Sequence, residues 1–328
     1  APVLKFTSPI SWHSPLELMR KLKNKTDRSH RFHQFSSIGC SQSDAMKNIL
    51  VPTDFSENAG KAVEFASVIA ESWNATITLL SVYTPAVSRY NMISPLLVDE
   101  IAQAKKEILE KLQLTAGTVK EVYPGVTCRT TVGTGETVEG ILEAVDSVKA
   151  DLIIMGTQGA SSIEKVLLGS NAADIIEKAE CPVLVVPGGT EIHMPKNIVF
   201  ATDYAYSDIE GARLLTSMAK VFEATITFVH VTKHEEDIDD ELKVIEKFTE
   251  EIKSATAYPK INFKILSDNT VFMGLDSIVE NAATDLMALS TRRRSLFEKL
   301  YNPSLTKKLA QYTQIPLLAF KTHGDQRK

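Results

Sequence analysis

The stretch that decides the fold is NILVPTDFS, residues 48–56, because it occurs twice in the chain. It returns as NIVFATDYA at residues 197–205, which is 149 residues later. Near the end of each copy, DLIIM at residues 151–155 matches DLMAL at residues 285–289, which is 134 residues later. A repeat of this length is a whole domain, so the 328-residue chain is predicted to hold a tandem pair of similar domains.

Each copy alternates short apolar runs with stretches of helical periodicity. Runs such as ILV at residues 49–51 and LIIM at residues 152–155 are apolar at every position, as is typical of parallel strands covered on both faces. The predicted strands are residues 48–52, 76–83, 126–131, 151–155 and 182–186 in the first copy, and 197–201, 225–231, 260–266, 285–289 and 316–320 in the second. This order predicts the α/β fold class, with two tandem doubly wound five-stranded parallel-sheet domains of Rossmann-like type.

The domain boundaries follow from the repeat and from the charge. Residues 1–45 carry seven Lys or Arg and three Asp or Glu, a formal charge of +4, whereas the whole chain has −5. We therefore expect a basic, disordered leader over residues 1–45, for which an organelle-targeting role is the less favoured interpretation. Met46 resembles a natural start of translation. The first domain is expected over residues 46–190 and the second over residues 195–322.

The composition excludes several classes of protein. Cys40, Cys128 and Cys181 lie far apart without a CxxC pair, which favours neither a disulfide framework nor a structural zinc site. Reduced thiols indicate a cytoplasmic protein. No apolar run approaches the roughly 20 residues of a membrane helix. The negative net charge argues against nucleic-acid or membrane partners.

A group of glycines follows the fourth predicted strand of the first copy. Gly156 and Gly159 come directly after it, and Gly169 with Ser170 opens the next helix. Parallel sheets bind ligands beyond the carboxyl ends of their strands. Backbone N–H groups at a glycine turn and at a helix N-terminus are suited to hold a polyphosphate. The spacing therefore predicts a phosphate-binding loop in the first copy.

These motifs resemble the universal stress protein family in its ATP-binding branch, which has an adenine nucleotide alpha hydrolase-like fold. The likeness rests on residues 46–56, on the G-x2-G-x9-G-S pattern from Gly156 and on residues 181–187, and it covers about residues 46–322. It implies that the chain is a stress-response regulator that holds ATP, with or without magnesium, in the first domain. The residues that match the family's nucleotide site are Pro52, Thr53, Asp54, Val82, Met155, Gly156, Gln158, Gly159, Gly169, Ser170 and Asn171.

The second copy departs from this pattern. It keeps Thr202, Asp203 and Val231, which match the adenosine end of the site. At the positions of the three glycines it has Ser290, Arg293 and Pro303, followed by Ser304. Since side chains replace bare backbone there, the second copy is not expected to bind ATP in the family manner. Residues 292–294, three arginines, are either a solvated basic loop, which we favour, or a grip for another anion.

Two other function classes stay open. One is a slow ATPase or an adenylate-transferring enzyme on the same sheet, although Asp54 is the only evident carboxylate, and neither catalytic residues nor a metal site can be named. The other is a scaffold that needs no nucleotide. The resemblance also implies that residues 182–186 lie beside residues 316–320 in an intramolecular pseudo-dimer, with a homodimer as a further option.

Overall fold

The computed structural model describes residues 46–85, 95–157, 168–204, 207–232, 238–268, 270, 273–275, 277–278, 284–291 and 315–321. The expected leader, residues 1–45, lies outside the described residues. The first half of the chain contains β1 (Asn48–Pro52), α2 (Glu57–Trp73), β2 (Thr76–Tyr83), α3 (Pro95–Val122), β3 (Thr127–Thr134), α4 (Thr137–Val148), β4 (Leu152–Gly156), α5 (Ser170–Lys178) and β5 (Val183–Val186). The second half contains β6 (Asn197–Ala201), α6 (Ser207–Phe222), β7 (Thr225–Thr232), α7 (Ile238–Thr256), β8 (Ile261–Ser267), β9 (Leu286–Thr291) and β10 (Leu317–Lys321).

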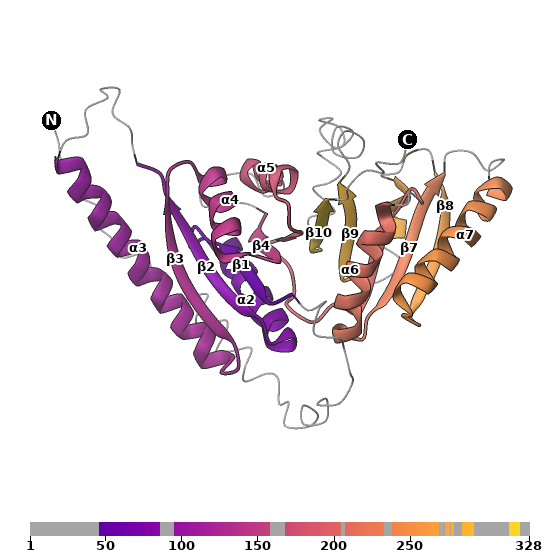
Figure 1. The fold of residues 1–328 in the computed structure, drawn as a ribbon, viewed down its shortest axis with the longest axis horizontal. Coiled ribbons are helices and arrows are strands. Elements are labelled where there is room, and N and C mark those ends of the chain that lie inside the picture. Colours follow the sequence, from indigo (N-terminus) through magenta and orange to yellow (C-terminus); the bar gives the residue numbers. More distant parts are fainter. Residues whose placement is uncertain are drawn as a thin grey trace.

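The described strands form a single sheet, in the order β3-β2-β1-β4-β5-β10-β9-β6-β7-β8 (Figure 1). Neighbouring strands within each half are parallel, and β5 and β10 pair antiparallel through Leu184 and Leu318. The α/β fold with alternating strands and helices is confirmed. The expectation that residues 182–186 lie beside residues 316–320 is confirmed, since β5 and β10 hydrogen-bond to one another instead of each leaving an unpaired edge.

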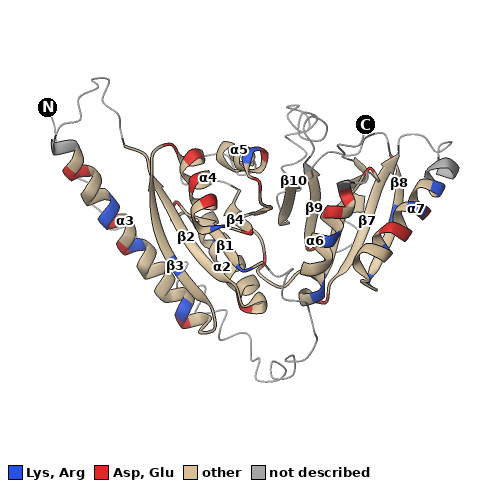
Figure 2. Cartoon of the chain, viewed as in Figure 1, with Lys and Arg blue, Asp and Glu red and all other residues tan. Residues whose placement is uncertain are grey.

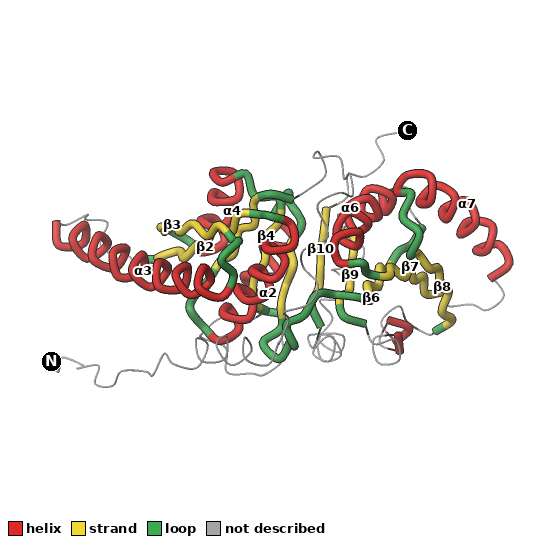
Figure 3. The backbone as a smooth tube through the Cα atoms, turned by 90° about the horizontal axis from the view of Figure 1, so that it is seen from below, coloured by secondary structure: helices red, strands yellow, loops and turns green. Residues whose placement is uncertain are grey.

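Alternate residues of each central strand enter different cores. Ile49 and Val51 pack in a cluster with α2 and α3, whereas Leu50 packs on the other face with α4 and α5. Figure 3 shows α2 and α3 on one side of the first-half strands and α4 on the other. Charged residues gather mainly on the helices (Figure 2). The unbroken apolar runs of the strands therefore reflect burial on both faces.

The predicted strands agree with the observed ones to within about a residue, except at β3 and at the end of β9, which lies two residues later than expected. Strand β3 was expected to end at residue 131, but it pairs with β2 as far as Thr134. Its C-terminal part is only half-buried, since β3 lies at the edge of the sheet. Apolar runs do not reveal such a strand, because an edge strand tolerates polar residues.

The two halves repeat one another at the level of single hydrogen bonds. One oxygen of Asp151 accepts from the backbone N–H groups of Lys47 and Asn48, at 2.8 and 2.9 Å. Asp285 does the same for Lys196 and Asn197, at the same distances. Each carboxylate therefore fixes the start of the first strand of its half against the fourth.

No helix in the described part of the chain is long and apolar enough to cross a membrane.

Candidate functional site

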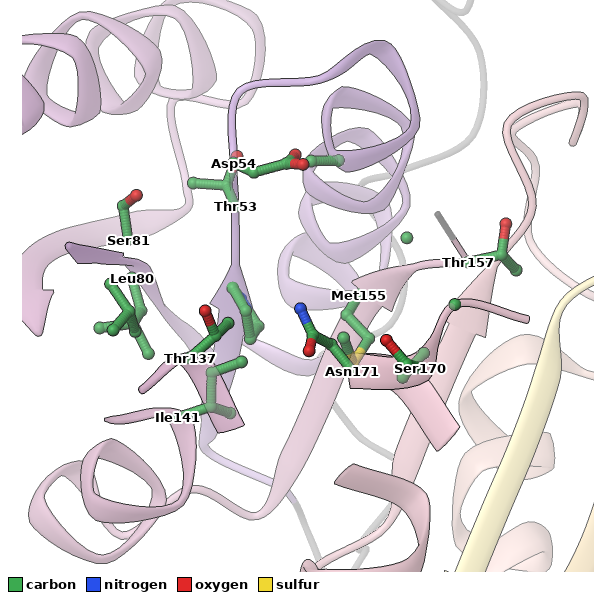
Figure 4. A pocket seen from close by; sticks show the side chains of 16 residues that line it. Thr53, Asp54, Leu80, Ser81, Thr137, Ile141, Met155, Thr157, Ser170 and Asn171 are labelled. Atoms are coloured by element: carbon green, nitrogen blue, oxygen red, sulfur yellow. The ribbon is translucent and has the colours of Figure 1, made fainter. Parts of the chain in front are cut away.

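A pocket of about 240 Å³ opens at the carboxyl ends of β1, β2 and β4 (Figure 4). The N-terminal ends of α4 and α5 complete it. This is the position where strand order reverses in the first half, between β1 and β4. Helices leave from opposite faces of the sheet there, so a crevice forms that side chains alone do not fill.

Nine of the predicted site residues line this pocket: Pro52, Thr53, Asp54, Val82, Met155, Gly156, Gly169, Ser170 and Asn171. Gln158 and Gly159 lie outside the described residues. The pocket is also lined by seven residues that the sequence did not single out: Ala59, Leu80, Ser81, Thr137, Ile141, Thr157 and Ala172. Ser81 and Thr157 could have been found by the same reasoning, because they adjoin Val82 and Gly156 at strand ends.

The turn from β1 to α2 is held rigidly by its own side chains. The Thr53 N–H donates to the Leu80 carbonyl at 2.8 Å, which joins the turn to β2. The hydroxyl of Thr53 accepts from the N–H of Phe55, and the carboxylate of Asp54 accepts from the N–H of Ser56. Phe55 has a φ of 62°, and Ser56 then caps α2 by accepting from the N–H of Ala59 at 3.2 Å. Asp54 is exposed at the rim as a result.

The start of α5 presents backbone donors to the pocket. The Gly169 N–H donates to the Thr157 carbonyl at 2.6 Å, so the start of α5 is tied to the end of β4. Gly169 is the N-cap and has no side chain to cap this helix. Within the part of the chain that the structure describes, the N–H groups of the first turn, in Ser170, Asn171 and Ala172, therefore have no capping partner, and these residues line the pocket. An anion at this position is favoured by the helix dipole as well.

The apolar wall of the pocket depends on a glycine inside α4. A Cβ atom on Gly140 would lie 2.9 and 3.1 Å from the two methyl groups of Val82. Gly140 therefore lets α4 pack closely against β2, and the same helix contributes Thr137 and Ile141 to the lining. A glycine inside a helix lowers the stability of that helix by about 1 kcal/mol relative to alanine. A glycine within a predicted helix therefore indicates a packing role, and this signal could have identified Gly140 from the sequence.

Gly156 also has a packing role that the sequence interpretation did not include. A Cβ atom at this residue would lie 3.0 Å from the carbonyl carbon and oxygen of Asn58, in the first turn of α2. The absence of a side chain at Gly156 thus lets α2 pack closely at the edge of the pocket. The same absence would let a ligand approach the backbone there.

The lining favours binding over acid–base chemistry. Among the described lining residues, Asp54 alone carries an ionisable side chain. The described residues hold no group of three or more His, Cys, Asp or Glu side chains placed to bind a metal ion. What remains is an apolar wall on one side and uncapped backbone donors on the other.

The second half is only partly described at the corresponding place. Ser290 lies at the end of β9 and is buried, whereas residues 292–294, Pro303 and Ser304 lie outside the described residues. His230 is half-buried, with its Nδ1 atom 2.9 Å from the Thr202 carbonyl and its ring against Tyr204. His230 is therefore a packed, hydrogen-bonded residue.

Comparison with known proteins gives a consistent result. A family model described as the universal stress protein family matches residues 46–187. The chain is 32% identical over 163 residues to a universal stress protein of Methanocaldococcus jannaschii, which covers 48% of this chain and 91% of that protein. It is 30% identical over 142 residues to a universal stress protein of Thermus aquaticus, which covers 43% of this chain and 98% of that protein. The crystal structure of a universal stress protein from Archaeoglobus fulgidus has a similar fold, with a TM-score of 0.64 and 19% identity, covering 84% of this chain and 98% of that one.

Proposed function

Because the chain belongs to the universal stress protein family, we propose that the pocket of its first half binds ATP and that the protein acts as a stress-response regulator. The observation that carries the proposal is the uncapped first turn of α5, which opens into a crevice between the ends of β1 and β4. Backbone donors of this kind suit phosphate oxygens. The apolar wall of Val82, Ile141 and Leu80 suits a base.

The family pattern implies which part of the nucleotide each lining residue would hold. Pro52, Thr53, Asp54 and Val82 would hold the adenosine end, and Gly169, Ser170 and Asn171 the phosphates, with Met155 and Gly156 between them. Gln158 and Gly159 remain predictions for the phosphate side. ATP is proposed with or without magnesium.

We also propose that residues 46–190 and 195–322 are two universal stress protein domains that form a pseudo-dimer within the chain. Support comes from the antiparallel pairing of β5 with β10 and from the matched roles of Asp151 and Asp285. A homodimer and a cytoplasmic location stay predictions from the sequence.

The test begins with the purified chain. Heat-denatured protein is analysed for released nucleotide, and ATP is then titrated by calorimetry into the wild type, Gly169→Val and Gly125→Val. Gly169 has a φ of −61° and a ψ of 151°, which valine adopts readily, so the variant is expected to fold while bulk is added at the pocket. Gly125 has nothing within 4 Å of its Cβ position and serves as the control.

We expect the wild type and Gly125→Val to bind ATP alike and Gly169→Val to bind it more weakly by roughly tenfold or more, the equivalent of one lost phosphate contact. Equal binding by Gly169→Val, or no binding by the wild type, would contradict the proposal. A turnover of order 1 per second or more would instead favour the enzyme interpretation.

A further inference from the structure

A fully buried carboxylate lies in the second half, where the first half has its pocket. Asp208, in the first turn of α6, has a relative exposure of 0%. One of its oxygens accepts from the hydroxyl of Thr202 at 2.7 Å, and the other accepts from the hydroxyl of Ser290 at 2.7 Å. A carboxylate is buried so completely only where such donors compensate its lost hydration.

The repeat identifies what these residues correspond to. Thr202 and Asp208 follow Thr53 and Ala59 by 149 residues, and Ser290 follows Gly156 by 134 residues. The sheets agree with this alignment, because Ile49 pairs with Leu152 and their counterparts Ile198 and Leu286 also pair. Thr53, Ala59 and Gly156 all line the pocket of the first half. The side chain of Asp208 therefore lies at the position that corresponds to that pocket, between the ends of β6 and β9.

Two further described features of the second half repeat the construction of the first half. A Cβ atom on Gly274 would lie 2.8 Å from both methyl groups of Val231, which repeats the contact of Gly140 with Val82. The hydroxyl of Thr202 accepts from the N–H of Tyr204, as that of Thr53 accepts from the N–H of Phe55. The two halves thus share the strand-end turn and the apolar wall, and they differ in the Asp208 carboxylate and the Ser290 hydroxyl that binds it.

We propose that Asp208 closes the second crevice as an internal plug, and that Asp208 and Ser290 together restrict nucleoside binding to the first half. The restriction rests on the proposed function, whereas the closure itself does not. A ligand entering the second crevice would have to displace a carboxylate that is covalently attached to α6 and bound to two hydroxyl groups. Without those residues, the wall of Val231 and the turn of Thr202 would accept a nucleoside, the class of ligand that needs no phosphate-binding loop.

The experiment gives the second half the residues of the first. The variant Asp208→Ala/Ser290→Gly is made in the otherwise wild-type chain, where the adenosine end of the first site contributes equally to every titration, and it is titrated with adenosine for a second bound molecule per chain. Asp208→Asn in the same background is the matched control, because the amide keeps the volume and the hydrogen-bonding reach of the carboxylate. Circular dichroism establishes that each variant is folded.

We expect the second site of the opened variant to bind adenosine at least roughly tenfold more tightly than that of Asp208→Asn, a difference in binding free energy of about 1.4 kcal/mol. A folded opened variant that binds no better than Asp208→Asn overturns the proposal. If the double variant does not fold, Ala59→Asp carries the test in the first half, with Ala59→Ser as its control. That plug is expected to lower ATP affinity by roughly tenfold or more, and unchanged affinity overturns the proposal.

The two proposals fail separately. A wild type that binds no nucleotide contradicts the proposed function, while adenosine binding by the opened second half still decides the role of Asp208.

Discussion

Replacing Gly140 by alanine tests whether the wall of the pocket depends on close packing of α4 against β2. The new methyl group would lie 2.9 and 3.1 Å from the methyl groups of Val82, where carbon atoms normally approach to about 3.5–4.0 Å. Val82 is β-branched and cannot easily rotate away. Alanine raises helix stability by about 1 kcal/mol relative to glycine, whereas overpacking costs about 1–3 kcal/mol. The net expectation is a loss of about 0–2 kcal/mol in the free energy of unfolding.

Two matched variants separate packing from binding. Gly117→Ala, in α3, has nothing within 4 Å of the added methyl group, so it is expected to stabilise the protein by about 0.5–1 kcal/mol. Gly274→Ala repeats the clash in the second half, against Val231 at 2.8 Å, and should cost stability without changing ATP affinity. Gly140→Ala should instead weaken ATP binding by roughly tenfold, because it displaces a pocket wall.

Denaturant unfolding measures the free energies, and calorimetric titration measures the affinities. If Gly140→Ala is as stabilising as Gly117→Ala, the close contact with Val82 does not restrict the helix and the packing argument is refuted. If Gly274→Ala weakens ATP binding as much as Gly140→Ala does, the loss of ATP affinity does not arise from the pocket of the first half.

Three further variants test other contacts. Asp151→Ala removes the acceptor of two backbone N–H groups and should lower the free energy of unfolding by about 1.5–3 kcal/mol. Asp146→Ala, at an exposed helix position, should have little effect, and equal denaturation midpoints for the two variants would contradict the role of Asp151. Gly211→Ala places a methyl group 2.0 Å from the ring of Phe320 and should lower the free energy of unfolding by about 1–3 kcal/mol. Adding Phe320→Leu to this variant should restore part of that loss, and additive losses in the double variant would show that the ring is not the obstacle. Burial raises the pKa of Cys128 and of Cys181 to about 11. In a Cys40→Ser chain, a thiol reagent should therefore react slowly at neutral pH and faster only as the pH approaches that value. Rapid reaction at pH 8 would refute the burial of these thiols.

Much of the fold could be predicted because similar strand patterns occur twice in the sequence. The strand starting at Asn48 and its counterpart at Asn197 have the bounds that their apolar runs indicate. Thr134 escaped prediction because an edge strand needs no apolar run. The pairing of β5 with β10, which joins the halves into one sheet, was expected from the family resemblance alone, because no local pattern encodes a contact between such distant segments.

The candidate site was predictable where a strand ends, and less so elsewhere. Thr53 and Met155 line the pocket because they end parallel strands, and this position can be read from the sequence. Thr137 comes from α4, whose approach to the pocket depends on the contact of Gly140 with Val82. Asp208 could be aligned with Ala59 by counting, but the sequence does not show that its side chain turns inward to Thr202 and Ser290.

The hydrogen bonds between β5 and β10 have a consequence for any fragment of this protein. A chain cut within residues 187–196 would separate two pieces that each display a bare strand, Val183–Val186 on one and Leu317–Lys321 on the other. The unpaired hydrogen-bonding groups of such a strand are most readily paired by the same strand in a second copy of the piece. Expressed alone, either piece is therefore expected to self-associate, and the two pieces mixed together should reassociate through β5 and β10.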